Sequence, residues 1–138
     1  MARIIVAGAD AAGVTCISAA IESLRHESIC VADPLDVLHE VVVNDAALVF
    51  LDEYFPYFNA LQITEMLRED PEVPEWLPIV IMACDEPNAK QMYEIGVTDY
   101  VLKEASTVTI QDMVVKYLRD DAGAPDATRN NPVAFLGP

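Results

Sequence analysis

The chain has 138 residues, of which 53% are hydrophobic and 22% charged, which suits one domain with a substantial apolar core. This composition excludes a disordered chain, and five glycines and three cysteines exclude collagen-like and disulfide-dense chains. With 23 acidic and 8 basic residues the net charge is −15 at pH 7. Such a surface repels nucleic-acid phosphates and anionic membranes, so we expect neither as a partner.

Short apolar runs alternate with helix-like segments along the first half of the chain. The run 4–7 suits a strand buried on both faces, and residues 28–32 and 46–51 are predicted as a second and a third short strand. Residues 11–24 place apolar side chains at steps of three and four, which predicts a helix. Asp33-Pro34 is typical of a helix start, with a cap followed by proline. The apolar face expected for that helix consists of Leu35, Leu38, Val41 and Val42.

The second half of the chain continues the alternation. Helices are predicted over 59–68 and over 88–95, where Gly96 ends the helix, and strands over 78–82 and 99–102. The segment from Thr109 to Asp112 resembles a capping box and predicts the start of the last helix. The apolar face expected there consists of Ile110, Met113, Val114, Tyr117 and Leu118.

Five strands alternating with five helices predict an α/β fold, in which helices cover both faces of a parallel sheet as a three-layer sandwich. Right-handed crossovers leave few topologies, and we expect a flavodoxin-like (βα)5 arrangement with strand order 2-1-3-4-5. The pattern ends near Asp120, so we expect one domain over 1–120 and a flexible tail over 121–138. Ligands of such sheets bind beyond the carboxyl ends of the strands.

Cysteine usage and hydropathy favour a cytoplasmic location. Cys16, Cys30 and Cys84 are odd in number and form no CxxC pair, as expected for reduced thiols. No apolar run reaches the roughly 18 residues that a membrane span needs. The apolar start of the chain is interrupted at Asp10, too early for a signal peptide.

Two strand ends carry residues with distinctive chemistry. Asp52 ends the third predicted strand and Lys103 follows the fifth. In the expected strand order both project into one crevice. A carboxylate there can accept a phosphoryl group, and a neighbouring ammonium can neutralise the added charge. The alternative is that Asp52 begins a turn and Lys103 is an ordinary solvated lysine.

The segment around each of these residues resembles the receiver domains of two-component response regulators. Residues 48–56 read LVFLDEYFP, which is similar to the phosphoacceptor segment of that family. Residues 96–103 read GVTDYVLK, which is similar to its lysine-containing segment, and the resemblance covers about residues 3–118. It implies that Asp52 is the phosphoacceptor, that Lys103 contacts the phosphoryl group and that Tyr100 is the switch aromatic.

The first strand departs from the family at the metal site. Receivers end this strand with two adjacent acidic residues that hold Mg²⁺, whereas Gly8 and Ala9 stand there in the simplest register. A shift of one residue would let Asp10 supply one of them. The ligands implied are then Asp10, Asp52 and the backbone carbonyl of Tyr54. Because Mg²⁺ usually relies on carboxylates, we expect any Mg²⁺ binding to be weak, and no other cofactor.

Two further departures concern the phosphoryl group itself. Ala83 stands where the family has Ser or Thr, so the usual hydroxyl contact cannot form, and Glu104 replaces the proline that commonly follows the lysine. These changes affect the chemistry and leave the scaffold intact. We therefore expect an atypical, stand-alone receiver, not an enzyme, in which phosphorylation is weakened or lost. The alternative is a normally phosphorylated receiver with Asp52 as acceptor.

Such a module would act through a protein partner: a histidine kinase, a phosphotransfer protein or an output protein. By resemblance, the binding surface includes the fourth helix, the fifth strand and the fifth helix. The side chains expected there are Lys90, Gln91, Tyr93, Glu94, Tyr100, Lys116 and Arg119. The same surface often pairs receivers, so a homodimer is an alternative to a foreign partner.

A nucleotide-binding half-domain of the Rossmann type is a second alternative. Gly8 to Gly13 follows a strand and opens a helix, and Asp33 stands where a ribose-binding acid would lie. Against this, Asp10 replaces the middle glycine, so its carboxylate would face the pyrophosphate. A phosphatase with an aspartate nucleophile fits less well, because Tyr54 stands where a second acid is needed.

Overall fold

Five parallel strands form a single sheet in the order β2-β1-β3-β4-β5, as the sequence predicts. The computed structural model describes residues 1–55 and 57–122. The strands are β1 (Arg3–Ala7), β2 (Glu27–Val31), β3 (Leu48–Asp52), β4 (Ile79–Ala83) and β5 (Asp99–Leu102). The helices are α1 (Ala11–Ser23), α2 (Val37–Val43), α3 (Ala60–Glu69), α4 (Ala89–Ile95) and α5 (Thr107–Ala122), and a 3-10 turn, η1 (Pro34–Asp36), precedes α2.

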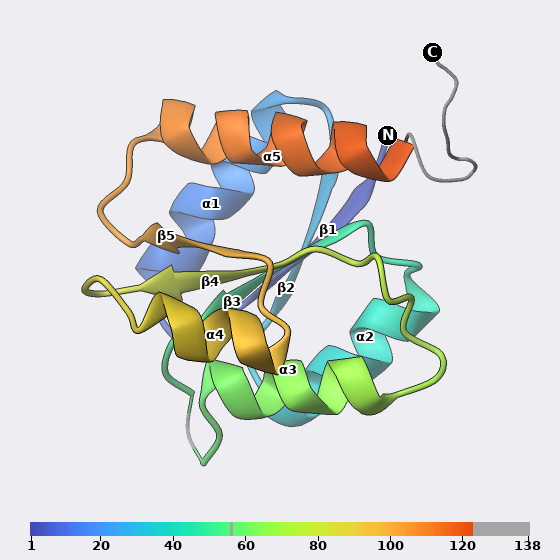
Figure 1. Ribbon diagram of the computed structural model, residues 1–138. Helices are drawn as coiled ribbons and strands as arrows, with labels where there is room; N and C mark the ends of the chain where they lie inside the picture. The colour runs from blue at the N-terminus through green and yellow to red at the C-terminus, as the bar shows by residue number, and fades with distance from the viewer. Residues whose placement is uncertain (56, 123–138) are drawn as a thin grey trace.

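The helices cover both faces of the sheet, with α1 and α5 on one side and α2, α3 and α4 on the other (Figure 1). Successive side chains of a strand point to opposite faces, so β1, β3, β4 and β5 supply both cores, whereas the edge strand β2 contributes Ile29 and Val31 to the core under α2, α3 and α4. In β1, Ile4 and Val6 pack under α1 and α5, while Ile5 and Ala7 pack under the other three helices. Burial on both faces explains why β1, β3 and β4 are nearly continuous apolar runs, whereas the edge strands β2 and β5 are partly exposed.

The start of α2 differs from the sequence-based expectation. Asp33 caps as predicted, since its side chain accepts a hydrogen bond from the Leu35 N–H at 2.9 Å, but it caps the 3-10 turn η1. A 3-10 turn has three residues per turn, so it rotates the following side chains away from an α-helical register. The expected core position of Leu35 is therefore wrong: it is 65% exposed, and Val37 is buried instead.

The last helix begins earlier than predicted. The capping residue is Ser106, whose hydroxyl accepts a hydrogen bond from the Thr109 N–H at 3.2 Å, so the capping box at Thr109 is wrong. A cap accepts from the third residue after it, and Thr109 occupies that position. The apolar face is confirmed, because Ile110, Val114 and Tyr117 are buried in the core between α5 and the sheet. Of the predicted tail, residues 123–138 lie outside the described residues.

Gly96 ends α4 as predicted, and it does so at a φ of +120°, which side chains rarely adopt. The turn there is fastened by Arg68 of α3. Its guanidinium donates to the carbonyls of Gly96 (2.9 Å) and Glu75 (3.2 Å) and to the hydroxyl of Thr98 (3.4 Å). Burial lowers the pKa of Arg68. This one side chain thus holds α3, the segment before β4 and the start of β5 together.

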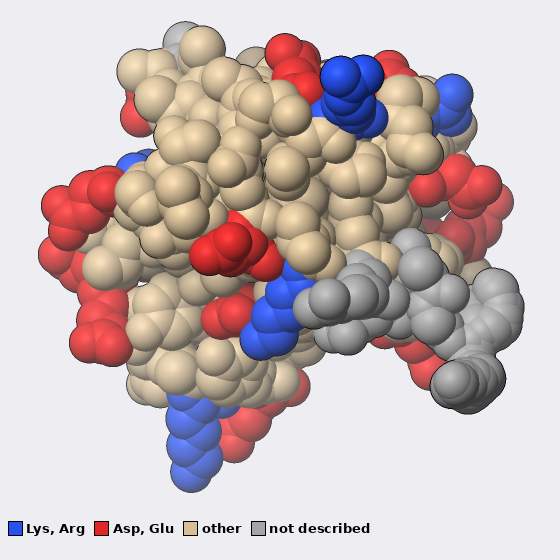
Figure 2. Space-filling view, turned by 90° about the horizontal axis from the view of Figure 1, so that it is seen from above, with Lys and Arg blue, Asp and Glu red and all other residues tan. Residues whose placement is uncertain are grey.

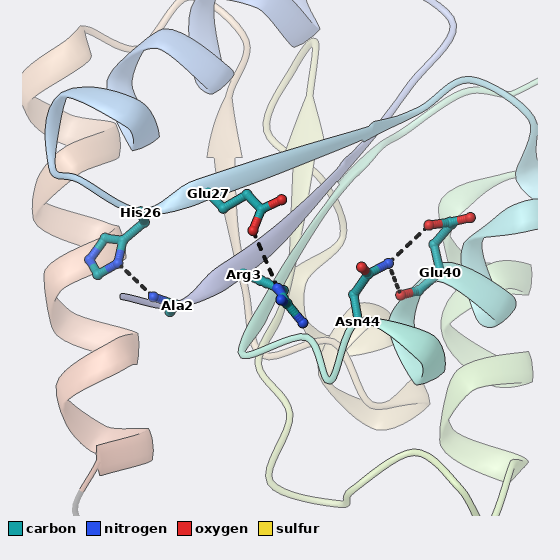
Figure 3. Close-up of polar contacts among 6 residues, drawn as sticks. All are labelled: Ala2, Arg3, His26, Glu27, Glu40 and Asn44. Carbon is teal, nitrogen blue, oxygen red and sulfur yellow. Dashed lines mark hydrogen bonds and ion pairs between the residues drawn. The ribbon is translucent and has the colours of Figure 1, made fainter.

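Polar contacts tie β1 to β2 at the amino edge of the sheet (Figure 3). Arg3 and Glu27 form an exposed ion pair at 3.3 Å, and His26 Nδ1 accepts a hydrogen bond from the Ala2 N–H at 3.1 Å. Nearby, Asn44 closes the end of α2 by donating to Glu40. Among the described residues, no helix is both long and apolar enough to cross a membrane.

Candidate functional site

The phosphoacceptor position predicted by the sequence lies at the carboxyl end of the central strand β3. All five residues of β3 are buried, and Asp52 is the last of them, with 4% of its surface exposed. Its Oδ1 accepts a hydrogen bond from the Tyr54 N–H at 3.1 Å. A buried carboxylate needs a cation or further donors to offset its desolvation.

Lys103 supplies that cation. It follows β5 directly, and its Nζ lies 2.7 Å from Oδ1 of Asp52, so the structure brings the two predicted residues together. Burial opposes the charge on Lys103, but the hydrogen bond and the negative charge of Asp52 outweigh it, so the pKa of Lys103 is raised above 10.5. The backbone holds Lys103 in place, because its N–H donates to the Ala83 carbonyl at 2.8 Å.

Asp10 caps α1 and also lines the cavity beside Asp52. Its side chain accepts a hydrogen bond from the Ala12 N–H at 3.2 Å, an N-cap interaction. The cavity, of about 250 Å³, is lined by Asp10, Asp52, Lys103 and Glu104, among other residues. Gly8 lies against Asp52: a Cβ built there would come within 3.1 Å of the Asp52 Cβ. Any side chain at position 8 would therefore be a tight fit and would require Asp52 or Val14 to shift slightly.

The residues present do not fit a ready-made Mg²⁺ site. In residues 1–55 and 57–122, no group of three His, Cys, Asp or Glu side chains could hold a metal ion. Of the predicted ligands, Asp10 and Asp52 share a cavity, but Lys103 engages one oxygen of Asp52 and the cap engages Asp10. Mg²⁺ demands several oxygen ligands in near-ideal octahedral geometry, and here one oxygen of each carboxylate is already engaged within the protein. Weak Mg²⁺ binding by Asp10, Asp52 and the Tyr54 carbonyl stays a prediction.

The end of β4 lacks a side-chain donor toward the site. Ala83 is fully buried and has no hydroxyl, and the next backbone N–H, that of Cys84, donates to Oε1 of Glu53 at 3.1 Å. Sequence reasoning missed this role of Glu53. The sequence places Glu53 directly after Asp52. It does not show which backbone N–H the Glu53 side chain reaches across the loops.

Tyr100, the predicted switch aromatic, lies half-buried on β5. Its hydroxyl donates to Oε2 of Glu86 in the β4–α4 loop at 3.0 Å. That hydrogen bond, with burial and the charge of Glu86, raises the pKa of Tyr100 above 10.0. Glu86 was not singled out from the sequence, because it lies 14 residues away in a loop.

The surface expected to bind a partner is assembled from α4, β5 and α5. On α4, Lys90, Gln91, Tyr93 and Glu94 are exposed, and Tyr93 keeps 48% of its surface accessible. On α5, Lys116 lies over the Tyr117 ring, 5.1 Å from its centre, and the Arg119 side chain lies outside the described residues. Figure 2, seen from above Figure 1, shows a largely uncharged face with acidic side chains at its left and right margins and a further acidic group beside a basic side chain near its centre.

No model of a protein family matches this sequence, and no curated protein sequence does either. Solved structures do match. A putative response regulator from Chloroflexus aurantiacus superimposes with a TM-score of 0.78 at 18% identity, over 86% of this chain and 98% of that one. The receiver domain of Francisella response regulator 1452 gives 0.77 at 17% identity, over 88% and 99%. A chemotaxis response regulator of Vibrio cholerae gives 0.77 at 16% identity, over 85% and 98%.

The likeness to these structures spans the described domain. It confirms the fold that the resemblance implied: this chain has the architecture of response regulator receiver domains. At such low identity the likeness concerns the fold, and the chemistry must be argued from the site itself.

Proposed function

We propose that this chain is a receiver-type module of two-component signal transduction. It acts through protein–protein interaction, and Mg²⁺-dependent phosphorylation of Asp52 is weakened or lost. The observation that carries the proposal is the buried pair in which Lys103 Nζ lies 2.7 Å from Asp52 Oδ1. The receiver fold supports the signalling class, and the replaced residues around the pair support the loss of chemistry.

Phosphoryl transfer depends on positioning and on neutralising the charge of the phosphoryl oxygens. Here the ammonium that should meet those oxygens is engaged by the acceptor itself. The end of β4 offers no hydroxyl at Ala83, and Glu53 occupies the Cys84 N–H. Of the three groups that could stabilise the charge of a phosphoryl group, the hydroxyl at position 83 is absent. The Lys103 ammonium and the Cys84 N–H already have partners within the protein.

A lasting Asp52–Lys103 pair would fix one conformation without kinase input. The module would then present the same surface at all times, in keeping with a binding role instead of a reaction. The partner proposed is a histidine kinase, a phosphotransfer protein or an output protein on the face of α4, β5 and α5, or a second copy of this chain. A cytoplasmic location fits these partners.

The test is the intact mass of the protein after incubation with acetyl phosphate and Mg²⁺, beside the Asp52→Asn variant. We expect no phosphoryl adduct on either protein while circular dichroism shows both folded. A gain of one phosphoryl group that Asp52→Asn abolishes would overturn the loss of phosphorylation.

A phosphoryl adduct on Asp52 would favour the alternative, a normally phosphorylated receiver. One observation supports this alternative. Within the described residues, Oδ2 of Asp52 receives no hydrogen bond, and a cavity of about 250 Å³ adjoins the carboxylate. Nucleotide binding by the first loop has weaker support, because the Asp10 carboxylate itself caps the helix N-terminus where a pyrophosphate would bind.

A further inference from the structure

A groove of about 180 Å³ lies where α3 and α4 meet the carboxyl edge of the sheet. It is distinct from the cavity at Asp52, with which it shares no lining residue. Apolar side chains, among them Leu61, Ile81 and Met92, line part of it. Glu53 and Tyr54, the two residues after the acceptor position, line it as well.

Glu53 is the one charged residue among the described residues that line the groove. It is half-buried, and its Oε1 is held in place by the Cys84 N–H at 3.1 Å. Within residues 1–55 and 57–122 it has no cationic partner, since the ion pairs there are Arg3–Glu27 and Lys103–Asp52. A partly desolvated carboxylate with one fixed oxygen and no counter-charge favours a cation that arrives from outside.

Two exposed tyrosines lie on the turn between β3 and α3, and one of them, Tyr54, lines the groove together with Glu53. Tyr54 is 64% exposed and Tyr57 97% exposed, whereas Phe55 and Phe58 pack against the core and anchor the turn. The turn is closed by a bridge between Tyr54 and Asn59, and it projects from the carboxyl edge of the sheet in Figure 1. Tyr57 has a φ of +72°, a strained conformation for an aromatic residue, and such strain is concentrated at functional sites.

We propose that this groove binds an arginine side chain presented by a basic segment of a partner protein. The apolar stem would lie along Leu61 and Met92, and the guanidinium would meet the Glu53 carboxylate next to the ring of Tyr54. Arginine suits the site better than lysine, because its planar fork pairs with a carboxylate and stacks on aromatic rings. The volume is below that of typical small-molecule sites, which accords with a single side chain as occupant.

The charge of the whole chain supports the same partner. A net charge of −15 attracts basic surfaces over a distance and speeds their association. Asp85 and Glu86, which are exposed in the β4–α4 loop, precede the groove residue Pro87 in sequence and add negative charge to that loop. This inference deepens the proposed function by naming the chemistry of a partner, and it rests on the chain being an interaction module.

The experiment is an NMR titration of the ¹⁵N-labelled full chain with a short peptide that has one arginine between glycines. The control peptide carries citrulline, which has nearly the same shape without the charge. The key variant is Glu53→Gln, which keeps an acceptor for the Cys84 N–H. Glu94→Gln is its matched control, because Glu94 is exposed on α4 outside the groove and the variant loses the same charge.

We expect saturable shifts at Tyr54, Leu61 and Gln91 with the arginine peptide and none with citrulline. Glu53→Gln should weaken binding about fivefold and Glu94→Gln less than about twofold. Equal weakening by both variants, or shifts centred on Asp10 and Glu104, would overturn the proposal. The titration should be unchanged in Asp52→Asn, because Asp52 does not line the groove. A failure of arginine binding in the titration and a failure of the proposed function in the phosphorylation assay can therefore be distinguished.

Discussion

One oxygen of Asp52, Oδ1, takes both the Lys103 ammonium at 2.7 Å and the Tyr54 N–H at 3.1 Å, while Oδ2 faces Gly8. The carboxylate is thus held from one side by a lysine whose side chain is 29% exposed. Stability and chemistry at this site consequently depend on the same contact.

Removing the cation should destabilise the fold. In Lys103→Met, Asp52 keeps its buried charge and loses its counter-ion, so we expect the free energy of unfolding at pH 7 to fall by about 2 kcal/mol. Urea unfolding followed by circular dichroism measures the change. The double variant with Asp52→Asn should recover most of the loss, because no uncompensated charge remains. A loss that the double variant does not reduce would contradict the ion pair as its cause.

The raised pKa values predict alkaline destabilisation. The folded-state pKa of Lys103 lies above 10.5 and that of Tyr100 above 10.0. In both cases the folded protein binds the proton more tightly than the unfolded chain does. The stabilisation is therefore complete below pH 10 and is lost as the pH rises through the raised values. Stability measured from pH 9 to about 11.5 should fall less steeply in Lys103→Met and in Tyr100→Phe than in the wild type.

The close approach of Gly8 to Asp52 gives a third prediction. In Gly8→Ala the new Cβ would lie 3.1 Å from both the Asp52 Cβ and a methyl group of Val14, so these neighbours must shift by a few tenths of an ångström. We expect a loss of about 1 kcal/mol. Gly13→Ala is the control: it lies within α1, its Cβ would meet just the end of the Asp10 side chain at 3.3 Å, and it should gain about 0.5 kcal/mol. Equal changes in the thermal unfolding of Gly8→Ala and Gly13→Ala would contradict a destabilising contact at position 8.

Arg68 gives a fourth prediction about the packing that supports β5. Arg68→Met leaves the carbonyls of Gly96 and Glu75 without this donor and should lower the free energy of unfolding by about 2 kcal/mol. Lys90→Met removes an exposed cation and should change it by less than about 0.5 kcal/mol. The unfolding midpoints of the two variants in urea, each compared with the wild type, measure the two changes in stability. A small effect of Arg68→Met would mean that solvent replaces these hydrogen bonds.

Most of the fold was predictable because its signals are local. Buried parallel strands are apolar runs, and the cap at Asp33 and the stop at Gly96 depend on neighbouring residues. The errors arose where local signals compete. Asp33-Pro34 starts a 3-10 turn, which exposes Leu35, and Ser106 caps α5 three residues before Thr109. Ser106 and Thr109 both carry a hydroxyl near the start of the helix, and the sequence does not show which of them caps it.

The sequence by itself determined the five strands and placed Asp52 and Lys103 at the carboxyl ends of two of them, because the periods of strands and helices are set by local sterics. Only the tertiary structure decided which polar atoms meet there. Asp10 turns to its own helix, Glu53 reaches the Cys84 N–H, and Glu86 reaches the Tyr100 hydroxyl. Those contacts depend on side-chain directions in loops that are far apart in sequence, which no local pattern encodes.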